Sequence, residues 1–248
     1  MIETEDAHGV RLIAFNRPEA RNAFNLAMYQ KVAGALEQAG ADDTVRTVVL
    51  TGRGSAFSAG QDLREMAEIA GGRAQPGAGD GFPRLLDSLE DCPKPLFAAV
   101  NGVGVGLGFT MLGHCDVVLV DEGARLRVPF AELGVPPEAA SSYLFPARMG
   151  WQQAARVLLC SEWVTAPEAV DIGIALRVCP SGTVVDETMA LATRVAAFPP
   201  EAVRAIKALM RAPQIDAVRQ ARARENDAFA RLLGSAATRD ALDSWGST

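Results

Sequence analysis

Two glycine-rich segments are the first parts of this 248-residue sequence that could do chemistry. Ser55–Leu63 and Asn101–Gly108 each follow an expected strand and lead into an expected helix. The first N–H groups of a helix have no partner inside it, so they stabilise negative charge at that end of the helix. Each segment therefore predicts either a site for a developing anion or a tight turn packed against a sheet.

The spacing of the glycines excludes two common phosphate sites. A GxGxxG fingerprint fails because Leu107 or Phe109 occupies its last glycine place, depending on where the pattern starts. No GxxxxGK[ST] sequence occurs, which excludes a P-loop. In the other segment, Asp62 can cap the following helix or accept a hydrogen bond from a ligand hydroxyl.

Glu138 is the acidic residue whose surroundings make it a candidate base. Pro-Glu-Ala occurs four times and is by itself an ordinary helix start. Near Glu138, however, the sequence has Phe130, Leu133, Val135 and Tyr143. An apolar pocket would raise the pKa of this carboxyl toward neutral pH, as a general base requires. A simple helix start is the alternative.

Composition excludes several other classes of protein. The chain carries 24 Lys and Arg against 30 Asp and Glu, so we expect no nucleic-acid partner. Two histidines give little material for a zinc site or a Ser-His-Asp triad, and we expect no metal. Four cysteines without a CxxC pair indicate reduced thiols in a cytoplasmic protein. No apolar run is long enough for a membrane span, and the acidic N-terminus predicts no secretory signal.

Hydropathy predicts an α/β body over residues 1–195 and a helical section over residues 196–248. That section either covers its own body or packs against another subunit. A surface loop is expected at Gly71–Gly81. The expected strands are Val10–Phe15, Arg46–Gly52, Pro95–Val100, Asp116–Val120 and Ala175–Cys179, and the clearest helices are Leu26–Ala39, Leu63–Ala70 and a last one over Ile215–Leu233.

Four segments together resemble the crotonase superfamily, the enoyl-CoA hydratase/isomerase fold. They are Asn16–Asn25, Leu50–Met66, Ala98–Asp116 and Val128–Gly150, and the similarity covers nearly the whole chain. The resemblance implies an α/β fold with a β-β-α spiral core and a helical C-terminal trimerisation region. It implies a homotrimer, or a hexamer built as two trimers. The implied partner is an acyl-CoA, whose coenzyme A is part of the substrate, so no separate cofactor is expected.

The resemblance also implies an oxyanion hole. In this family two backbone N–H groups hold the thioester oxygen, and the matching residues are Gln61 and Leu107. Many members have glycine where this chain has Leu107, a change that leaves the N–H in place. Two such donors stabilise an enolate oxygen more than a neutral thioester, which lowers the barrier to proton removal.

The acidic positions indicate the subtype. Hydratases of the family resemble one another in having two glutamates, and the matching residues here are Thr110 and Phe130. Glu138 instead matches the single glutamate of the peroxisomal-type Δ3,Δ2-enoyl-CoA isomerases, whereas Glu132 is expected on the surface. The resemblance therefore implies an isomerase of fatty-acid β-oxidation that converts a 3-enoyl-CoA into the 2-trans isomer.

Further contacts with the substrate are implied in the same way. Lys207 matches a basic position that reaches CoA phosphate, with a solvated lysine as the alternative. Phe229 is expected near the adenosine end or in the trimer contact. Gly71–Gly81 is expected to shape the acyl pocket. The remaining implied contacts are Arg21, Ala23, Ala59, Asp62 and Leu63 for CoA, and Phe130, Val135 and Tyr143 for the pocket.

Three alternatives remain open. One is a ring-type enoyl-CoA isomerase, and another is residual hydratase activity on the same site. The third is a CoA-binding scaffold without catalysis, which the leucine at position 107 and the missing hydratase pair favour. The carboxylate of Glu138 in an apolar setting opposes the scaffold.

Overall fold

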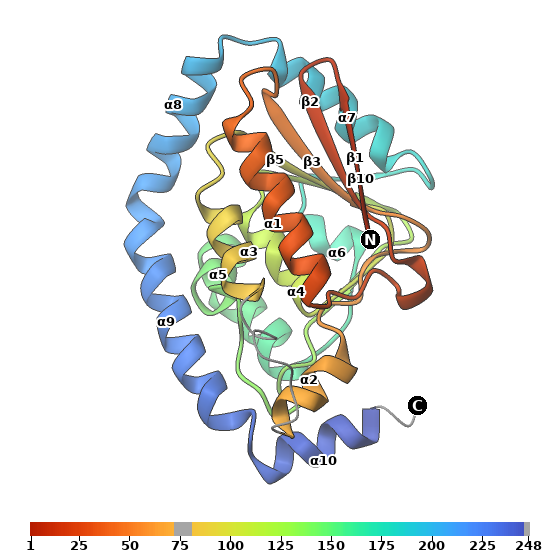
Figure 1. Ribbon diagram of the computed structural model, residues 1–248, viewed down its shortest axis with the longest axis vertical. Helices are drawn as coiled ribbons and strands as arrows, with labels where there is room; N and C mark the ends of the chain where they lie inside the picture. Colours follow the sequence, from red (N-terminus) through yellow and green to blue (C-terminus); the bar gives the residue numbers. More distant parts are fainter. Residues whose placement is uncertain (72–80, 246–248) are drawn as a thin grey trace.

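A six-stranded sheet in the order β1-β2-β3-β5-β7-β10 forms the upper part of the computed structural model (Figure 1). The structure describes residues 1–71 and 81–245. All neighbouring strands are parallel except β1 and β2, which are antiparallel. The strands are β1 (Ile2–Ala7), β2 (Val10–Phe15), β3 (Thr47–Gly52), β5 (Leu96–Val100), β7 (Val117–Asp121) and β10 (Arg177–Cys179).

The central strands are apolar on both faces because helices cover both. In β3, Val48 and Leu50 pack with α1 (Leu26–Ala41) and α3 (Gly81–Glu90) on one face. Val49 between them packs with α7 (Val184–Ala196) on the other face. A parallel sheet buried on both sides requires such continuous apolar runs. The α/β body predicted from the sequence is therefore confirmed.

A second, four-stranded sheet has the order β4-β6-β8-β9 and includes parts of both glycine-rich segments. Its strands have two or three residues each: β4 (Ala56–Ser58), β6 (Val103–Val105), β8 (Arg125–Arg127) and β9 (Val164–Thr165). Asn101–Gly108, which the sequence predicts as a glycine-rich turn, thus contains the strand β6. Its glycines allow close packing, since a Cβ on Gly108 would lie 2.3 Å from the carbonyl oxygen of Ser58.

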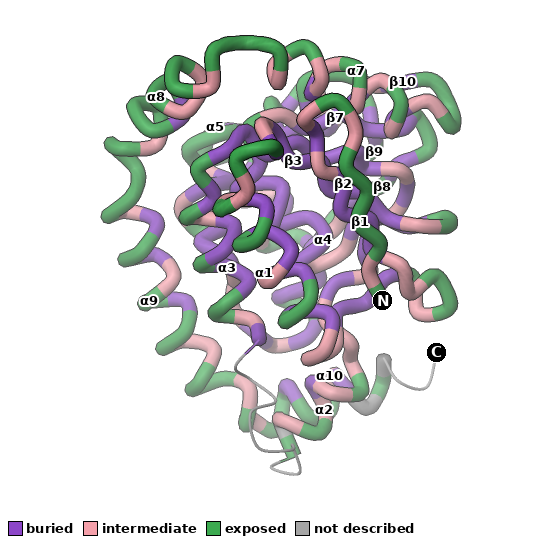
Figure 2. Tube along the Cα trace, turned by 45° about the horizontal axis from the view of Figure 1, so that its top comes forward, coloured by how far each residue is buried: buried purple, intermediate pink, exposed green. Residues whose placement is uncertain are grey.

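The C-terminal arm consists of α8 (Pro200–Arg211), α9 (Ile215–Leu232) and α10 (Ala236–Trp245). Helices α8 and α9 run along the long side of the molecule, and α10 lies beside α2 (Leu63–Ala70) (Figure 1). The sequence predicts the last helix at Ile215–Leu233, so α10 is an addition from the structure. Figure 2 shows that the arm is largely exposed whereas the body beside it is buried. The other helices are α4 (Leu107–Thr110), α5 (Ser141–Cys160) and α6 (Ala166–Asp171).

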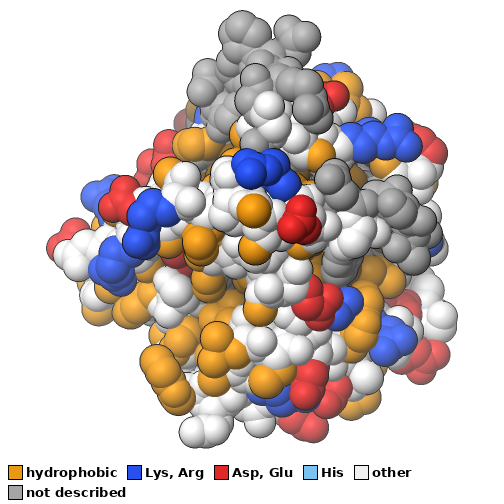
Figure 3. Space-filling view, turned by 90° about the horizontal axis from the view of Figure 1, so that it is seen from below, with side chains coloured by type: hydrophobic (Ala, Val, Ile, Leu, Met, Phe, Trp, Pro, Cys, Tyr) orange, Lys and Arg blue, Asp and Glu red, His pale blue; other side chains and the backbone are white. Residues whose placement is uncertain are grey.

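The end of the molecule where α2 and α10 lie has a mixed surface (Figure 3). On the part of this face that is described, hydrophobic side chains are exposed among acidic and basic ones. Residues 72–80, which include most of the loop expected to shape the acyl pocket, lie outside the described part of the chain. Among the described helices, none combines the length and the apolar character needed to cross a bilayer.

Candidate active site

Glu138 lines a cavity of about 70 Å³ at which both glycine-rich segments meet. The loop from Pro129 to Glu138 and helix α9 close its other sides. Almost all of the lining is apolar or backbone. The lining residues are Ala59, Gln61, Leu63, Met66, Val105, Gly106, Leu107, Pro129, Phe130, Leu133, Val135, Glu138 and Phe229.

Glu138 is held in place through its side chain and its backbone. The hydroxyl of Thr110 donates a 3.0 Å hydrogen bond to the Oε1 atom of Glu138. The hydroxyl of Ser141 donates to the carbonyl oxygen of Glu138 at 2.6 Å. Two residues in the left-handed conformation, Ala139 and Ala140, then turn the chain into α5. The carboxyl thus belongs to the first residue of a tight turn.

Burial raises the pKa of Glu138 to about 8. The charged carboxylate loses its hydration in this apolar cavity, which is the largest cause of the shift. The hydrogen bond from Thr110 lowers the pKa, and the nearby carboxylate of Glu225 raises it. A carboxyl with this pKa is a stronger base than an ordinary glutamate and can still lose its proton near neutral pH.

We expect Thr110→Val to move the acid limb of activity to higher pH by up to about one unit. The change keeps the shape of the side chain and removes the hydrogen bond that favours the charged form of Glu138. The measurement is kcat/KM against pH. Thr188→Val is the matched control, since Thr188 is equally buried but bonds to Val184 in α7. An acid limb that stays fixed in Thr110→Val, or moves down, contradicts this role.

The two N–H groups expected to form the oxyanion hole lie on adjoining segments. Gln61 forms a β-bridge with Phe24, and Leu107 is the first residue of α4. Among the described residues, neither N–H donates a hydrogen bond. Gly60, with a φ of +85°, brings the segments together, since a Cβ there would lie 3.3 Å from the nitrogen of Leu107. Two unpaired donors therefore border the cavity that holds a carboxyl.

The residues expected to contact CoA fall into three groups. Ala59, Leu63 and Phe229 line the cavity itself. Arg21 lies beside it, where its carbonyl oxygen accepts a hydrogen bond from the N–H of Ala59. The others are engaged in structure: the carbonyl oxygen of Ala23 accepts from Arg17, and Asp62 caps α2 and pairs with Arg17 at 2.8 Å.

The prediction that Tyr143 lines the acyl pocket is wrong. Tyr143 packs against Ala140, Leu144, Val218 and Ala221, between the start of α5 and α9. The helix that begins after Ala140 turns this side chain away from Glu138, because neighbours in sequence point in different directions on a helix. Phe130 and Val135 do line the cavity. Glu132 is exposed, as expected, and it pairs with Arg127.

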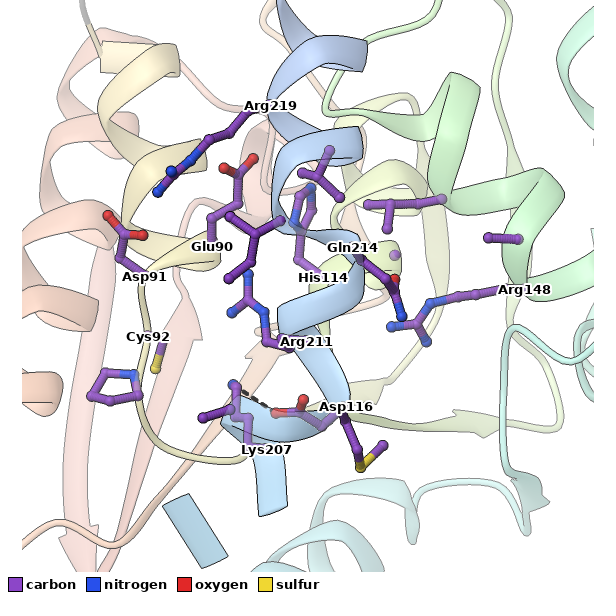
Figure 4. Close-up of a pocket in the computed structure, with 18 of the residues that line it drawn as sticks. Glu90, Asp91, Cys92, His114, Asp116, Arg148, Lys207, Arg211, Gln214 and Arg219 are labelled. Atoms are coloured by element: carbon purple, nitrogen blue, oxygen red, sulfur yellow. Dashed lines mark hydrogen bonds and ion pairs between the residues drawn. The ribbon is translucent and has the colours of Figure 1, made fainter. Parts of the chain in front are cut away.

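Lys207 lies in a second cavity, of about 590 Å³, between the C-terminal arm and the body (Figure 4). Figure 4 shows Lys207 and Asp116 pointing toward each other. The ammonium donates to the Oδ2 atom of Asp116 and to the carbonyl oxygen of Lys94, both at 2.7 Å. The side chain is only 6% exposed, so the interpretation as a solvated lysine is wrong. Asp116 neutralises the charge of Lys207. Lys207 does not line the cavity of Glu138, so within this chain it lies apart from the other residues expected to contact CoA.

Several residues of the site were not identified from the sequence. Met66, Val105 and Pro129 complete the apolar wall, together with Leu133, which the sequence indicates as an apolar neighbour of Glu138. The sequence indicates Thr110 only as the place of a missing glutamate, whereas in the structure its hydroxyl bonds to Glu138. Among the described residues, no group of three or more His, Cys, Asp or Glu side chains is positioned to hold a metal ion.

Comparison with known proteins identifies the family to which this chain belongs. Residues 5–246 match the enoyl-CoA hydratase/isomerase family. The chain is 40% identical over 206 residues to enoyl-CoA delta isomerase 2 of Rattus norvegicus, a match over 82% of this chain and 52% of that protein. It is 36% identical over 231 residues to 2,3-dehydroadipyl-CoA hydratase of Escherichia coli, over 93% and 88% of the two chains. The chain thus spans about half the length of the rat isomerase.

The fold is similar to that of a solved structure. The crystal structure of an enoyl-CoA hydratase/isomerase from Pseudoalteromonas atlantica matches with a TM-score of 0.93 and 34% sequence identity. The match covers 99% of this chain and 96% of that chain. The crotonase fold implied by the four sequence segments is therefore confirmed. On sequence and on fold, the chain belongs to the enoyl-CoA hydratase/isomerase family.

Proposed function

We propose that this chain is an enoyl-CoA isomerase that converts a 3-enoyl-CoA into the 2-trans-enoyl-CoA. One observation carries the proposal. Glu138 is the single carboxyl that lines a small apolar cavity, within the described residues, and two unpaired N–H groups border the same cavity. Moving a double bond requires one group that takes and returns a proton. Adding water requires groups that both activate the water and deliver a proton.

The proposed reaction uses Glu138 twice. Its carboxylate removes a proton from C2, and the electrons of that C–H bond form a dienolate. The N–H groups of Gln61 and Leu107 stabilise the negative oxygen of this intermediate. Glu138 then returns the proton at C4, which leaves the double bond between C2 and C3. No proton is gained or lost overall, so a second catalytic carboxyl is not needed.

Two observations favour the isomerase over the hydratase. Thr110 and Phe130 stand where the resemblance predicts the two hydratase glutamates, and neither side chain can act as a carboxylic acid. The rat relative is named as an isomerase, although the Escherichia coli relative is named as a hydratase. An acyl-CoA as the substrate follows from the same names.

We further propose that the C-terminal arm takes part in a homotrimer, alone or within a hexamer. Three apolar side chains of α8, Ile206, Leu209 and Met210, are exposed in the single chain. Burying such a surface against another copy is favourable. The cytoplasmic location stays a prediction.

The test of the proposed activity is an absorbance assay with 3-hexenoyl-CoA. We expect the conjugated 2-enoyl thioester to form, with no change in the mass of the product. A product heavier by one water would identify a hydratase instead. Binding of acyl-CoA without turnover of 3-hexenoyl-CoA or of a ring-modified enoyl-CoA would identify the scaffold.

We expect kcat/KM to rise about tenfold per pH unit below pH 8 and to level off above it, because only the ionised form of Glu138 can remove a proton. The raised pKa of about 8 sets the position of this limb. The measurement covers about pH 6 to about pH 10 in a constant-ionic-strength buffer. A flat profile over that range contradicts Glu138 as the base.

A further inference from the structure

Glu225 is a buried carboxylate of the C-terminal arm that contacts the turn after Glu138. It lies on α9 and is 5% exposed. Its Oε2 atom accepts a 2.7 Å hydrogen bond from the N–H of Ala140, and its Oε1 atom accepts one of 2.9 Å from the N–H of Ser142. Both carboxylate oxygens are therefore used on one short stretch of backbone.

The backbone held by Glu225 is in an unfavourable conformation. Ala139 and Ala140 both have φ values of 57°, in the left-handed region. This conformation is unfavourable for a residue with a Cβ, because the Cβ comes too close to the backbone. The residue at the N-cap of α5 is Ala140, whose methyl group cannot accept a hydrogen bond from the first N–H groups of the helix. Glu225 supplies from another helix the acceptors that a capping side chain would give.

Other contacts hold the neighbouring atoms but not these N–H groups. The carbonyl oxygen of Ala139 contacts Nε2 of His114 at 2.8 Å, and Ser141 holds the carbonyl oxygen of Glu138. From the C-terminal arm, Glu225 holds these N–H groups by hydrogen bonds, and Val218 and Ala221 pack in the same apolar cluster as Ala140. One helical turn further along α9, Phe229 lines the cavity of Glu138. The same face of α9 thus fixes the turn and closes the pocket.

We propose that Glu225 is a positioning residue for Glu138: it holds the N–H groups of Ala140 and Ser142 and so fixes the turn from which Glu138 enters the cavity. The role as stated rests on the proposed isomerase function, since Glu138 is the base of that reaction. Glu225 itself does not line the cavity.

The charge of Glu225 acts on Glu138 as well. Burial raises the pKa of Glu225, whereas the hydrogen bonds from Ser142 and Ala140 and the charge of Arg222 favour its ionised form. Arg222 also pairs with Asp87 and Glu90 of α3. Burial lowers the pKa of His114, on the other side of the turn, to about 4, so it carries no charge at neutral pH. The negative charge of Glu225 is therefore one cause of the raised pKa of Glu138, after burial.

Two substitutions of Glu225 separate its position from its charge. Glu225→Gln keeps the size, removes the charge and turns an amide N–H₂ toward one of the two backbone N–H groups. We expect kcat to fall about 10- to 100-fold with a smaller change in KM, because the base is misplaced. The acid limb of kcat/KM should also move to lower pH. Glu225→Asp keeps the charge and draws the carboxylate back, so kcat should fall while the acid limb stays in place.

The matched control is Glu168→Gln, because Glu168 accepts hydrogen bonds from Thr165 at the start of α6, away from the cavity. We expect this variant to keep the kcat and the acid limb of the wild type. A drop in melting temperature for Glu225→Gln, with kcat and the acid limb unchanged, would show a purely structural cap and overturn the proposal.

A titration by ¹³C NMR of carboxyl-labelled glutamate gives a readout that needs no turnover. We expect the pKa of Glu138 to be lower in Glu225→Gln than in the wild type. If the wild type does not turn over 3-hexenoyl-CoA, the proposed function fails, and this titration still decides whether Glu225 controls Glu138. An unchanged pKa of Glu138 in the titration would overturn the proposal for Glu225.

Discussion

Glu138→Gln is expected to lower the turnover of 3-hexenoyl-CoA by roughly 10³- to 10⁴-fold, since general acid–base catalysis is lost from both proton transfers. The amide has the same size as the carboxyl and can keep a contact with the hydroxyl of Thr110. It cannot accept a proton from C2. The measurement is the rate of formation of the conjugated thioester at saturating substrate. Turnover close to that of the wild type would remove Glu138 from the mechanism.

The stability of Glu138→Gln shows whether the loss of turnover comes from the missing proton acceptor or from unfolding of the protein. Because the pKa of Glu138 is raised on folding, the stability it contributes is complete below its unfolded pKa and is lost as pH rises through about 8. The glutamine side chain has no proton to lose, so the variant does not become less stable through this group as pH rises. We expect the variant to gain about 4 kcal/mol over the wild type as pH rises from about 5 to about 9. Glu132→Gln, at an exposed neighbour, is the control for both activity and stability.

Gly60→Ala is expected to lower kcat about 10²- to 10³-fold, because it separates the two donors of the oxyanion hole. A Cβ at Gly60 would lie 2.5 Å from the carbonyl oxygen of Val105, so the two segments must move apart. That movement displaces the N–H of Leu107 relative to the N–H of Gln61. We expect KM to change less than kcat, since the donors act mainly on the dienolate.

The control for Gly60→Ala separates the clash from backbone strain. Gly182 also has a positive φ, of 77°, but a Cβ there meets nothing within 4 Å. Gly182→Ala therefore introduces the same kind of strain without moving the site, and we expect it to keep the kcat of the wild type. A Gly60→Ala variant with normal kcat would show that these N–H groups do not hold the reacting oxygen.

The sequence predicts the large elements of the fold because they bury long apolar runs. Val10–Phe15 and Arg46–Gly52 could be recognised as strands since each is a short, mostly apolar run that contains β-branched residues. The short strands could not be recognised from the sequence in this way. In β6, Val103–Val105 has glycine at its centre, and it is a strand only because β4 and β8 lie on either side of it. The strand β1, Ile2–Ala7, lies at the edge of the sheet and its central residues are exposed, so its sequence lacks the apolar pattern that would predict a strand.

The site could be predicted where the resemblance gives a residue-by-residue match. Glu138, Gln61 and Leu107 come together in the structure as the family segments imply. Tyr143 was misplaced because distance along the sequence does not give the direction of a side chain on a helix. Glu225 could not be found, because its link to Ala140 depends on how α9 packs against α5.

The most direct test of the account is the fate of the hydrogen at C2. The substrate is 3-hexenoyl-CoA with two deuterium atoms at C2, and the product is analysed by mass spectrometry and NMR. If Glu138 carries the proton from C2 to C4, the conjugated product keeps its mass and bears deuterium at C4. A product heavier by one water, or a conjugated product whose C4 never carries deuterium, would contradict the shuttle by a single buried carboxylate.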